Sequence, residues 1–106
     1  MRRGELYWAR LPEPVGQRPV LVVTRTPAIA VRNAVTVAPV TRTIRGIASE
    51  LLLGREHGLT APCVADCDSL RTIPRRVLGR KRIGALGVAD QIRLDAALRF
   101  ALGIRT

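Results

Sequence analysis

Two short apolar runs, each with polar residues at one end, most constrain how this chain can fold. The run at residues 20–24 follows Arg18 and Pro19, and the run at residues 35–40 leads into Thr41. Both runs are rich in valine, which favours β-strands, and we expect both strands to be buried. If the two strands pair antiparallel, Arg18 at the start of the first lies near Thr41 at the end of the second. A guanidinium and a hydroxyl at one place can hold a phosphate group.

The remaining pattern predicts a small, curled β-barrel with one helix at its end, a mainly β (α+β) fold in a single domain at residues 1–106. Prolines and glycines divide the chain into short segments, as is typical of such barrels. We expect strands at residues 5–10, 18–24, 34–40, 48–53, 63–68 and 79–86. Residues 70–73 can extend the fifth strand, and Pro74 opens a single helical turn.

The only long helix is expected at residues 88–102, where Gly103 is placed to end it. Its apolar residues fall on two sides, with Leu94, Leu98, Ala101 and Leu102 on one and Ile92, Ala96 and Phe100 on the other. One side can pack on the sheet, and the other is covered either by a second subunit or by a deep core. Aromatic residues make up only 3% of the chain, so we expect Tyr7, Trp8 and Phe100 to pack among aliphatic side chains.

The chain is strongly basic, with a formal net charge of +10 from 18 Lys and Arg against 8 Asp and Glu, and Lys81 is its only lysine. Arginine forms bidentate contacts with phosphate and stacks on bases. A GC-rich genome also favours arginine over lysine, but it does not explain the net charge. A chain this basic is expected to bind a polyanion, either a nucleic acid or an acidic partner protein.

Cysteine and histidine are too few for a metal site. Cys63 and Cys67 have no second cysteine pair, and His57 is the only histidine, so we expect no zinc and two buried free thiols on one face of a strand. The first residues form no apolar signal region, and no stretch is long enough to span a bilayer. These features favour a cytoplasmic protein.

Five segments of the chain carry a resemblance to a known family. They are residues 3–8, 16–23, 37–46, 67–73 and 82–86 with the helix that follows. The most specific feature is an Arg-Pro strand, at Arg18 and Pro19, followed by an Ala-Pro strand that ends in Thr41. In this order the segments resemble the MazF/PemK family of toxin endoribonucleases, from bacterial type II toxin–antitoxin systems, over nearly the whole chain.

The resemblance implies a fold, an activity and partners. The fold would be an SH3-like barrel of about five to seven strands that forms a homodimer. The activity would be cleavage of single-stranded RNA at short sequences with no metal or other cofactor, and the catalytic pair would be Arg18 and Thr41. The partner would be a small acidic antitoxin, together with which such toxins bind DNA, and no membrane is involved. A net charge of +10 suits both RNA and an acidic protein.

Metal-free cleavage can use the 2′-OH of the RNA as nucleophile, leaving a 2′,3′-cyclic phosphate and a 5′-OH. Arg18 suits stabilisation of the crowded anionic phosphorane, and Thr41 can donate a hydrogen bond to a phosphoryl oxygen. Arginine is a poor general base because its pKa exceeds about 12, so the proton acceptor stays open. Glu13 is a candidate base, in a loop that is shorter than in many relatives. His57 is the usual choice for acid–base work but lies outside the matched segments.

Other polar residues near the pair are expected to line an RNA groove. They are Gln17, Arg42, Thr43, Arg45 and Arg71. The loop that begins at Arg42 can also be read as a solvated basic loop with no ligand. Two other functions stay open, namely a non-catalytic nucleic-acid-binding β-barrel and a toxin of the same fold that poisons DNA gyrase.

Overall fold

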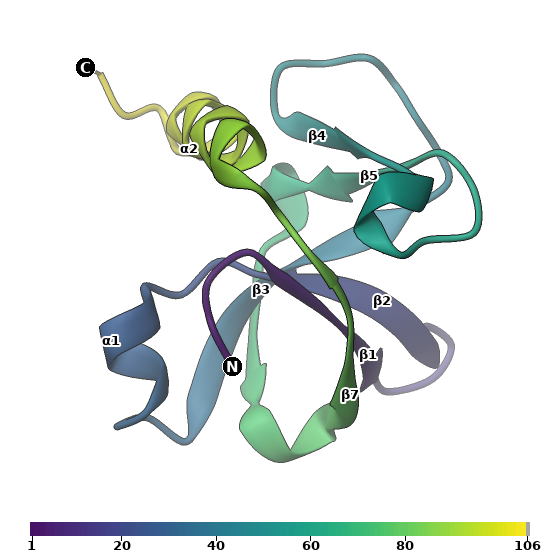
Figure 1. Ribbon diagram of the computed structural model, residues 1–106, viewed down its shortest axis with the longest axis vertical. Coiled ribbons are helices and arrows are strands. Elements are labelled where there is room, and N and C mark those ends of the chain that lie inside the picture. The colour runs from purple at the N-terminus through teal and green to yellow at the C-terminus, as the bar shows by residue number, and fades with distance from the viewer. Residues whose placement is uncertain (106) are drawn as a thin grey trace.

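The computed structural model describes residues 1–105, and short antiparallel strands make up most of it. The elements are β1 (Glu5–Arg10), β2 (Gln17–Val22), α1 (Thr26–Ile29), β3 (Ala34–Thr41), β4 (Glu50–Leu53), β5 (Cys63–Asp66), β6 (Arg71–Pro74), β7 (Leu78–Ala85) and α2 (Val88–Leu102). Three 3₁₀ turns lie between them, η1 (Arg55–His57), η2 (Cys67–Ser69) and η3 (Arg75–Val77). Figure 1 shows the curled sheet with α2 packed above one end of it. The expected mainly β fold with a C-terminal helix is confirmed.

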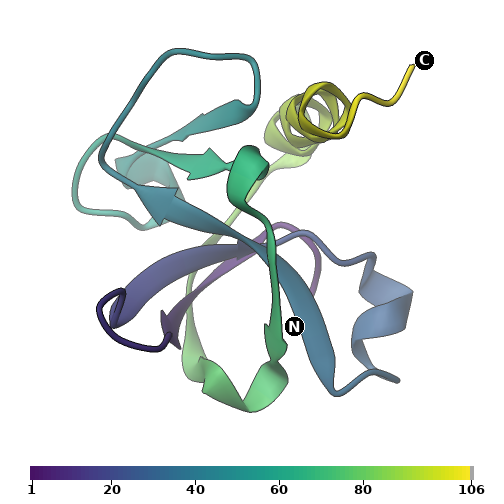
Figure 2. The ribbon, with the colours of Figure 1, turned by 180° about the vertical axis from the view of Figure 1, so that it is seen from behind.

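Strand β3 is the centre of the sheet, whose order is β4-β5-β3-β2-β1-β7. It pairs with β2 along one edge, and along the other edge it pairs first with β6 and then with β5. From behind, the loop after β3 arches over β4 (Figure 2). No pairing joins β6 to β7 in the described chain, so the sheet curls into a barrel-like shape without closing.

Side-chain alternation along the strands divides the core into two clusters. The helix-side cluster consists of Leu6, Leu21, Ala38, Val40, Leu51, Leu53, Cys63, Ala65, Cys67, Leu86, Leu94 and Ala97. The inner cluster consists of Tyr7, Ala9, Leu11, Val20, Val22, Ile29, Val35, Val37, Ile73 and Leu78. Because Leu21 pairs with Ala38 and Val20 pairs with Pro39, neighbouring residues of β2 point into different clusters. Both apolar runs identified in the sequence are therefore buried on both faces.

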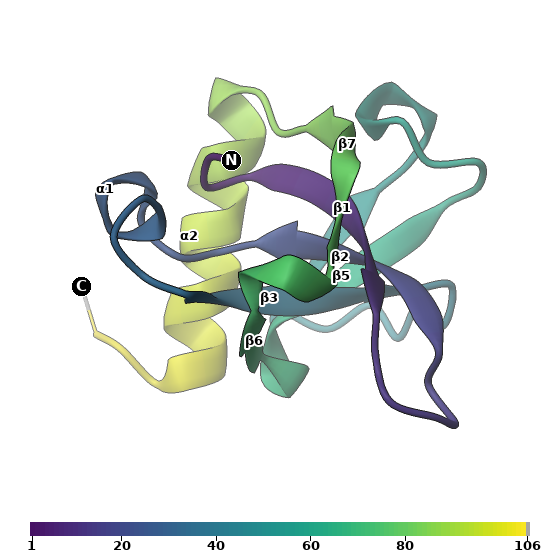
Figure 3. The ribbon, with the colours of Figure 1, turned by 90° about the horizontal axis from the view of Figure 1, so that it is seen from below.

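Helix α2 covers only one end of the sheet, and the loop between β1 and β2 lies at the far end (Figure 3). Leu94 and Ala97 are buried in the helix-side cluster. The second apolar side of the helix faces outward, since Ile92 is 64% and Phe100 63% exposed. A deep core around this side is therefore excluded, and Leu102 is exposed as well rather than packed on the sheet.

The turn η1 is tied to both β7 and α2. A Cβ on Gly84 would overlap the carbonyl oxygen of His57, so the turn and the strand approach this closely only because that residue is glycine. His57 is 4% exposed, and its Nδ1 accepts the N–H of Gly54 at 3.1 Å. Its Nε2 therefore carries the proton and donates to the Asp90 carboxylate at 2.6 Å, at the start of α2. This contact lowers the pKa of Asp90.

Two aromatic residues differ from expectation. Tyr7 packs in the inner cluster, and its hydroxyl donates to Glu5 at 2.9 Å. Trp8, however, is 46% exposed, and Phe100 lies on the uncovered side of α2. The expectation that all three aromatics pack among aliphatic residues is therefore wrong for Trp8, which α2 does not cover, and for Phe100, which lies on the outward side of α2.

Both cysteines are buried free thiols, as expected. They do not share one strand, because β5 ends at Asp66, whose carboxylate accepts the N–H of Asp68 and opens η2. Burial raises the pKa of Cys67 to about 11, with the nearby Asp66 carboxylate adding to the rise. Within residues 1–105, no cluster of His, Cys, Asp or Glu side chains is placed to hold a metal ion. The same residues include no helix long and apolar enough to cross a membrane.

Candidate active site

Arg18 and Thr41 lie at adjacent ends of paired strands, as the antiparallel pairing predicted. Val20 is opposite Pro39, and continuing this register by two residues places Arg18 opposite Thr41. Both side chains line the same two cavities. The pairing of β2 with β3 therefore brings together two residues that are 23 positions apart in the chain.

The two cavities meet at Arg18, Thr41 and Thr43. The first, here called the apolar cavity, has a volume of about 560 Å³, and its wall includes Trp8, Pro19, Val40, Leu59, Cys63 and Ile83. The second, here called the polar cavity, has a volume of about 310 Å³, and its wall includes Leu11, Arg45, Glu50, Asp66, Ser69 and Arg71. A chain passing from one cavity to the other would pass over the Arg18–Thr41 pair.

The residues predicted to bind RNA all line these cavities. Gln17 and Arg42 line the apolar cavity, Thr43 lines both, and Arg45 and Arg71 line the polar cavity. The five residues thus lie along two adjoining cavities, here together called the groove, although they come from three separate segments of the chain.

The two candidate bases are not brought to the pair. Glu13 is exposed and lines neither cavity, but lies on a neighbouring hollow of about 810 Å³ together with Arg71. His57 also lines neither cavity, and both of its ring nitrogens already have partners, Gly54 and Asp90. The structure thus explains His57 as part of the junction between η1 and α2.

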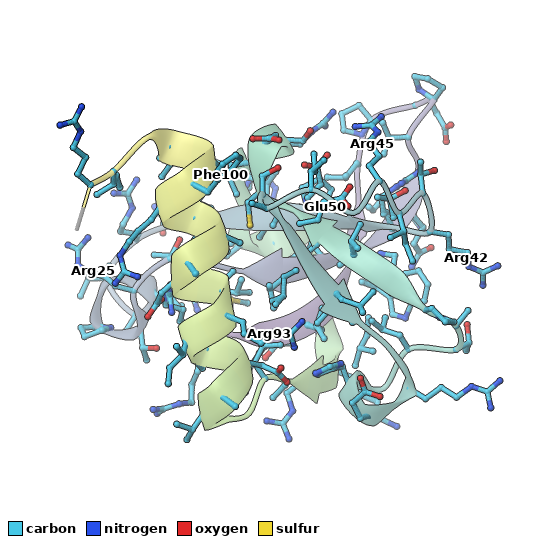
Figure 4. The ribbon with its side chains drawn as sticks, turned by 90° about the horizontal axis from the view of Figure 1, so that it is seen from above. Arg25, Arg42, Arg45, Glu50, Arg93 and Phe100 are labelled. Carbon is cyan, nitrogen blue, oxygen red and sulfur yellow. The ribbon has the colours of Figure 1, made fainter. Side chains whose placement is uncertain are left out.

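The guanidinium groups of the groove have no carboxylate partner. Among residues 1–105, the side chains of Arg18, Arg45 and Arg71 form no hydrogen bond or ion pair, and Arg42 makes only a long contact of 3.4 Å with the Thr60 hydroxyl. Arg42 points away from the body of the molecule, on the side opposite α2 (Figure 4). These charges are therefore available to an anion.

The acids of the polar cavity are engaged by neutral donors. Glu50 accepts the backbone N–H groups of Arg45 and Gly46, both at 3.0 Å, and lies beside Arg45 in Figure 4. Asp66 accepts the N–H of Asp68 and the hydroxyl of Ser69. Glu50 thereby fixes the loop that carries the groove arginines without pairing with a guanidinium.

Thr41 is oriented by its own loop. Its Oγ1 accepts the backbone N–H of Thr43 at 3.2 Å. With one lone pair engaged in this way, the hydroxyl proton of Thr41 is free to be donated to a ligand. A guanidinium with free N–H groups and a hydroxyl with a free proton, side by side, can together bind a phosphate.

Sequence reasoning missed Trp8 and Glu50 as groove residues. Trp8 shares a face of β1 with the buried Leu6, so alternation alone predicts that it is buried too. Glu50 follows a loop whose path over β4 no local pattern describes. For Trp8, the one available signal was the rarity of tryptophan, which occurs once in the chain.

Comparison with known proteins assigns the family. The sequence pattern of the family described as "PemK-like, MazF-like toxin of type II toxin-antitoxin system" matches residues 2–102. The chain belongs to this family. Its resemblance to MazF/PemK toxins is thereby confirmed over nearly the whole length, with the Arg18–Thr41 pair inside the matched region.

Two relatives from Mycobacterium tuberculosis resemble the chain in sequence. Probable endoribonuclease MazF2 is 42% identical over 104 residues, which cover 97% of this chain and 99% of the relative. Endoribonuclease MazF3 is 42% identical over 81 residues, which cover 76% of this chain and 78% of the relative. The similarity to MazF2 spans both proteins almost from end to end.

Solved structures agree with the sequence comparison. Mycobacterium tuberculosis toxin MazF-mt6 superposes with a TM-score of 0.88 at 35% identity, covering 96% of this chain and 99% of that one. A mycobacterial endoribonuclease in complex with its cognate antitoxin gives a TM-score of 0.85 at 24% identity, covering 100% and 98% of the two chains. At that identity, the second match supports the fold alone.

Proposed function

We propose that this protein, acting as a single domain, is a metal-independent, sequence-specific endoribonuclease that cleaves single-stranded RNA as the toxin of a toxin–antitoxin pair. The observation that carries the proposal is the placement of an unpaired guanidinium, that of Arg18, beside the Thr41 hydroxyl where two cavities meet. Family membership and relatives named as endoribonucleases support it.

In the proposed reaction, the 2′-OH of the RNA attacks the adjacent phosphorus and forms a phosphorane that carries additional negative charge. The bond to the 5′ oxygen of the next nucleotide then breaks and this oxygen takes up a proton from water, leaving a 2′,3′-cyclic phosphate and a 5′-OH. Arg18 binds the non-bridging oxygens, and its contact strengthens as charge develops there. Thr41 donates its free proton to one of the same oxygens.

The proton of the 2′-OH needs an acceptor, and Glu13 remains our candidate. Its carboxylate lies on the hollow next to the polar cavity, so it can serve only if the loop of residues 11–16 brings it towards Arg18 when RNA is bound. A Glu13→Gln variant tests this role. If the carboxylate is the base, Glu13→Gln slows cleavage at neutral pH, and an unaltered rate would exclude Glu13 from the reaction.

The groove is proposed to bind RNA through its other polar side chains. Gln17, Arg42 and Thr43 would contact the nucleotide in the apolar cavity, and Arg45 and Arg71 would contact the one in the polar cavity. A net charge of +10 supports binding of a polyanion, and such binding weakens steeply as salt increases.

Two exposed surfaces, the basic groove and the outward apolar side of α2, suggest two protein partners. We propose a small acidic antitoxin that covers the basic groove and binds DNA together with the toxin, and a homodimer that covers the exposed apolar side of α2 at Ile92 and Phe100. We place the protein in the cytoplasm, where its RNA substrate would be. Sedimentation tests the dimer, and absence of a short acidic reading frame beside the gene would count against the antitoxin.

The activity is tested by incubating the purified protein with a long RNA in EDTA and mapping the new ends. We expect discrete cuts with 5′-OH ends, and no cuts from folded Arg18→Ala or Thr41→Ala variants. RNA that is bound but intact would point to a non-catalytic binding module. Intact, unbound RNA together with inhibition of DNA gyrase would instead assign the gyrase-poisoning function.

A further inference from the structure

We propose that Trp8 is a base-stacking platform, on which one RNA base beside the scissile phosphate stacks in the apolar cavity. The proposal rests on RNA being the substrate and adds a residue that no part of the proposed reaction requires. The proposal also gives the path of the bound RNA, which continues past the indole of Trp8 towards Arg10 and Arg76.

The position of Trp8 in the sheet makes it a rigid, accessible surface. It lies directly opposite Pro19 on β2, one residue from Arg18. Its side chain is 46% exposed, although Leu6 on the same face of β1 is fully buried. The indole is therefore held on a paired strand but left uncovered, at the point where α2 no longer covers the sheet.

The surroundings of Trp8 fit a nucleotide better than an apolar side chain. The apolar cavity offers Pro19, Leu59 and Ile83 to the faces of a base, and Arg18 and Arg42 to its phosphates. A nucleotide has the same division between a flat ring and a charged group. Stacking on an aromatic side chain in a basic groove is the usual way in which single strands are held.

A second hollow lies on the other side of Trp8. It has a volume of about 360 Å³ and shares Trp8 and Gln17 with the apolar cavity. Arg10 and Arg76 line it, and within residues 1–105 neither guanidinium forms an ion pair. Trp8 thus lies between two basic hollows. An RNA with one base stacked on the indole can place its next phosphate near Arg10.

The test uses the fact that Trp8 is the only tryptophan in the chain. A 2′-O-methyl RNA containing the mapped cleavage site lacks the nucleophile and binds without being cut. When it is titrated into the intact protein, we expect saturable quenching of the tryptophan fluorescence. An oligomer of equal length with an abasic residue beside the scissile position should bind more weakly and leave most of the fluorescence unquenched.

Two variants separate stacking from simple burial of apolar surface. Trp8→Leu removes the aromatic face, and we expect it to weaken binding of the 2′-O-methyl RNA by roughly 5- to 150-fold. Trp8→Phe keeps an aromatic ring and should retain most of the affinity. Binding is followed by anisotropy of a labelled oligomer, and thermal unfolding confirms that each variant is folded.

Each outcome decides the proposal. Quenching that requires the base, together with loss of affinity in Trp8→Leu and retention in Trp8→Phe, supports it. RNA that binds without quenching overturns it while leaving the proposed nuclease function intact. Failure of the RNA to bind overturns both. Quenching by an acidic antitoxin peptide but not by RNA overturns it and assigns Trp8 to a protein interface.

Discussion

At the helix end of the molecule each of three arginines contacts a carboxylate, whereas in the groove Arg18 and its neighbours contact none. Arg3 pairs with Asp95 at 2.8 Å, and Arg82 pairs with Glu5 at 3.0 Å. Arg93 likewise pairs with Asp90 at the start of α2. Arginine side chains therefore form ion pairs at the helix end, whereas the arginine charges in the groove have no carboxylate partner in the described part of the chain.

The difference does not come from a shortage of acids in the groove. Glu50 and Asp66 line the polar cavity, where Glu50 Oε1 accepts two backbone N–H groups and Asp66 accepts one backbone N–H and the Ser69 hydroxyl. Neither carboxylate forms an ion pair with an arginine of the groove within residues 1–105, so the N–H groups of those guanidiniums stay free to donate. The groove thus differs from the helix end in having guanidinium groups without a carboxylate partner among the described residues, and such groups can bind a phosphate.

Among the substitutions in the groove, we expect one at Thr41 to have the largest effect on the rate of RNA cleavage. Replacing it by valine keeps the shape of the side chain but removes the proton that would be donated to the phosphate, so cleavage should slow by about 10²–10³-fold. Thr41→Ser keeps the hydroxyl and should retain most of the activity. Initial rates on a fluorogenic RNA measure both, and equal rates for the two variants would refute the role of the hydroxyl.

A substitution at the helix end should lower the stability of the fold and leave the rate of RNA cleavage unchanged. Arg3 donates to the carbonyl of Val23 and to the side chains of Gln91 and Asp95, so Arg3→Ala should lower the free energy of unfolding by about 1–3 kcal/mol. Cleavage measured well below the melting temperature should be unchanged. A variant that lost activity without losing stability in denaturant titrations would break the division between the two regions.

Salt dependence distinguishes the two groups of arginines directly. If Arg45 and Arg71 each contact a phosphate, alanine at either position should reduce the slope of log affinity against log salt by about 0.7. Arg93→Ala is the matched control, because its charge is already paired with Asp90. The slopes come from anisotropy titrations at several salt concentrations, and equal slopes for all three variants would show that the groove charges do not meet RNA.

The smallest effect concerns acid stability. Burial alone would raise the pKa of Glu5, but hydrogen bonds from Tyr7 and Arg82 lower it below its ordinary value of 4.5. A lowered folded-state pKa contributes stability above pH 4.5 that is lost as the pH falls through the folded value. Glu5→Gln should therefore flatten the fall in unfolding free energy below about pH 5. Denaturant titrations from pH 7 to about pH 3 would detect this change, and parallel curves would contradict it.

Much of this fold follows from local patterns. The valine-rich runs predict β2 and β3, and their antiparallel pairing places Arg18 opposite Thr41 when the observed register is continued by two residues. Gly103 ends α2 in a left-handed conformation with φ of 68°, as its position after the helix predicted. Strand propensity and helix capping depend on residues close together in the chain, so a single sequence contains them.

What could not be predicted depends on distant parts of the chain. Trp8 is exposed because α2 stops short of it, and no pattern within β1 contains that information. Glu13 lines the same hollow as Arg71 and neither cavity at the Arg18–Thr41 pair, in a loop closed by hydrogen bonds from Leu11 N–H to the Gly16 carbonyl and from Val15 N–H to the Pro12 carbonyl. Likewise, β5 ends two residues earlier than expected because Asp66 caps η2.

The most direct test of the account is single-turnover cleavage of RNA by Arg18→Ala in EDTA, with and without added guanidinium ion. We expect a rate at least about 10²-fold below that of the unaltered protein, partly restored by guanidinium, while Arg18→Lys stays slow because it lacks the planar fork. Unaltered binding of the 2′-O-methyl RNA would show that only the reaction was affected. Cleavage by Arg18→Ala at the rate of the unaltered protein would contradict the central claim that this free guanidinium stabilises the scissile phosphate.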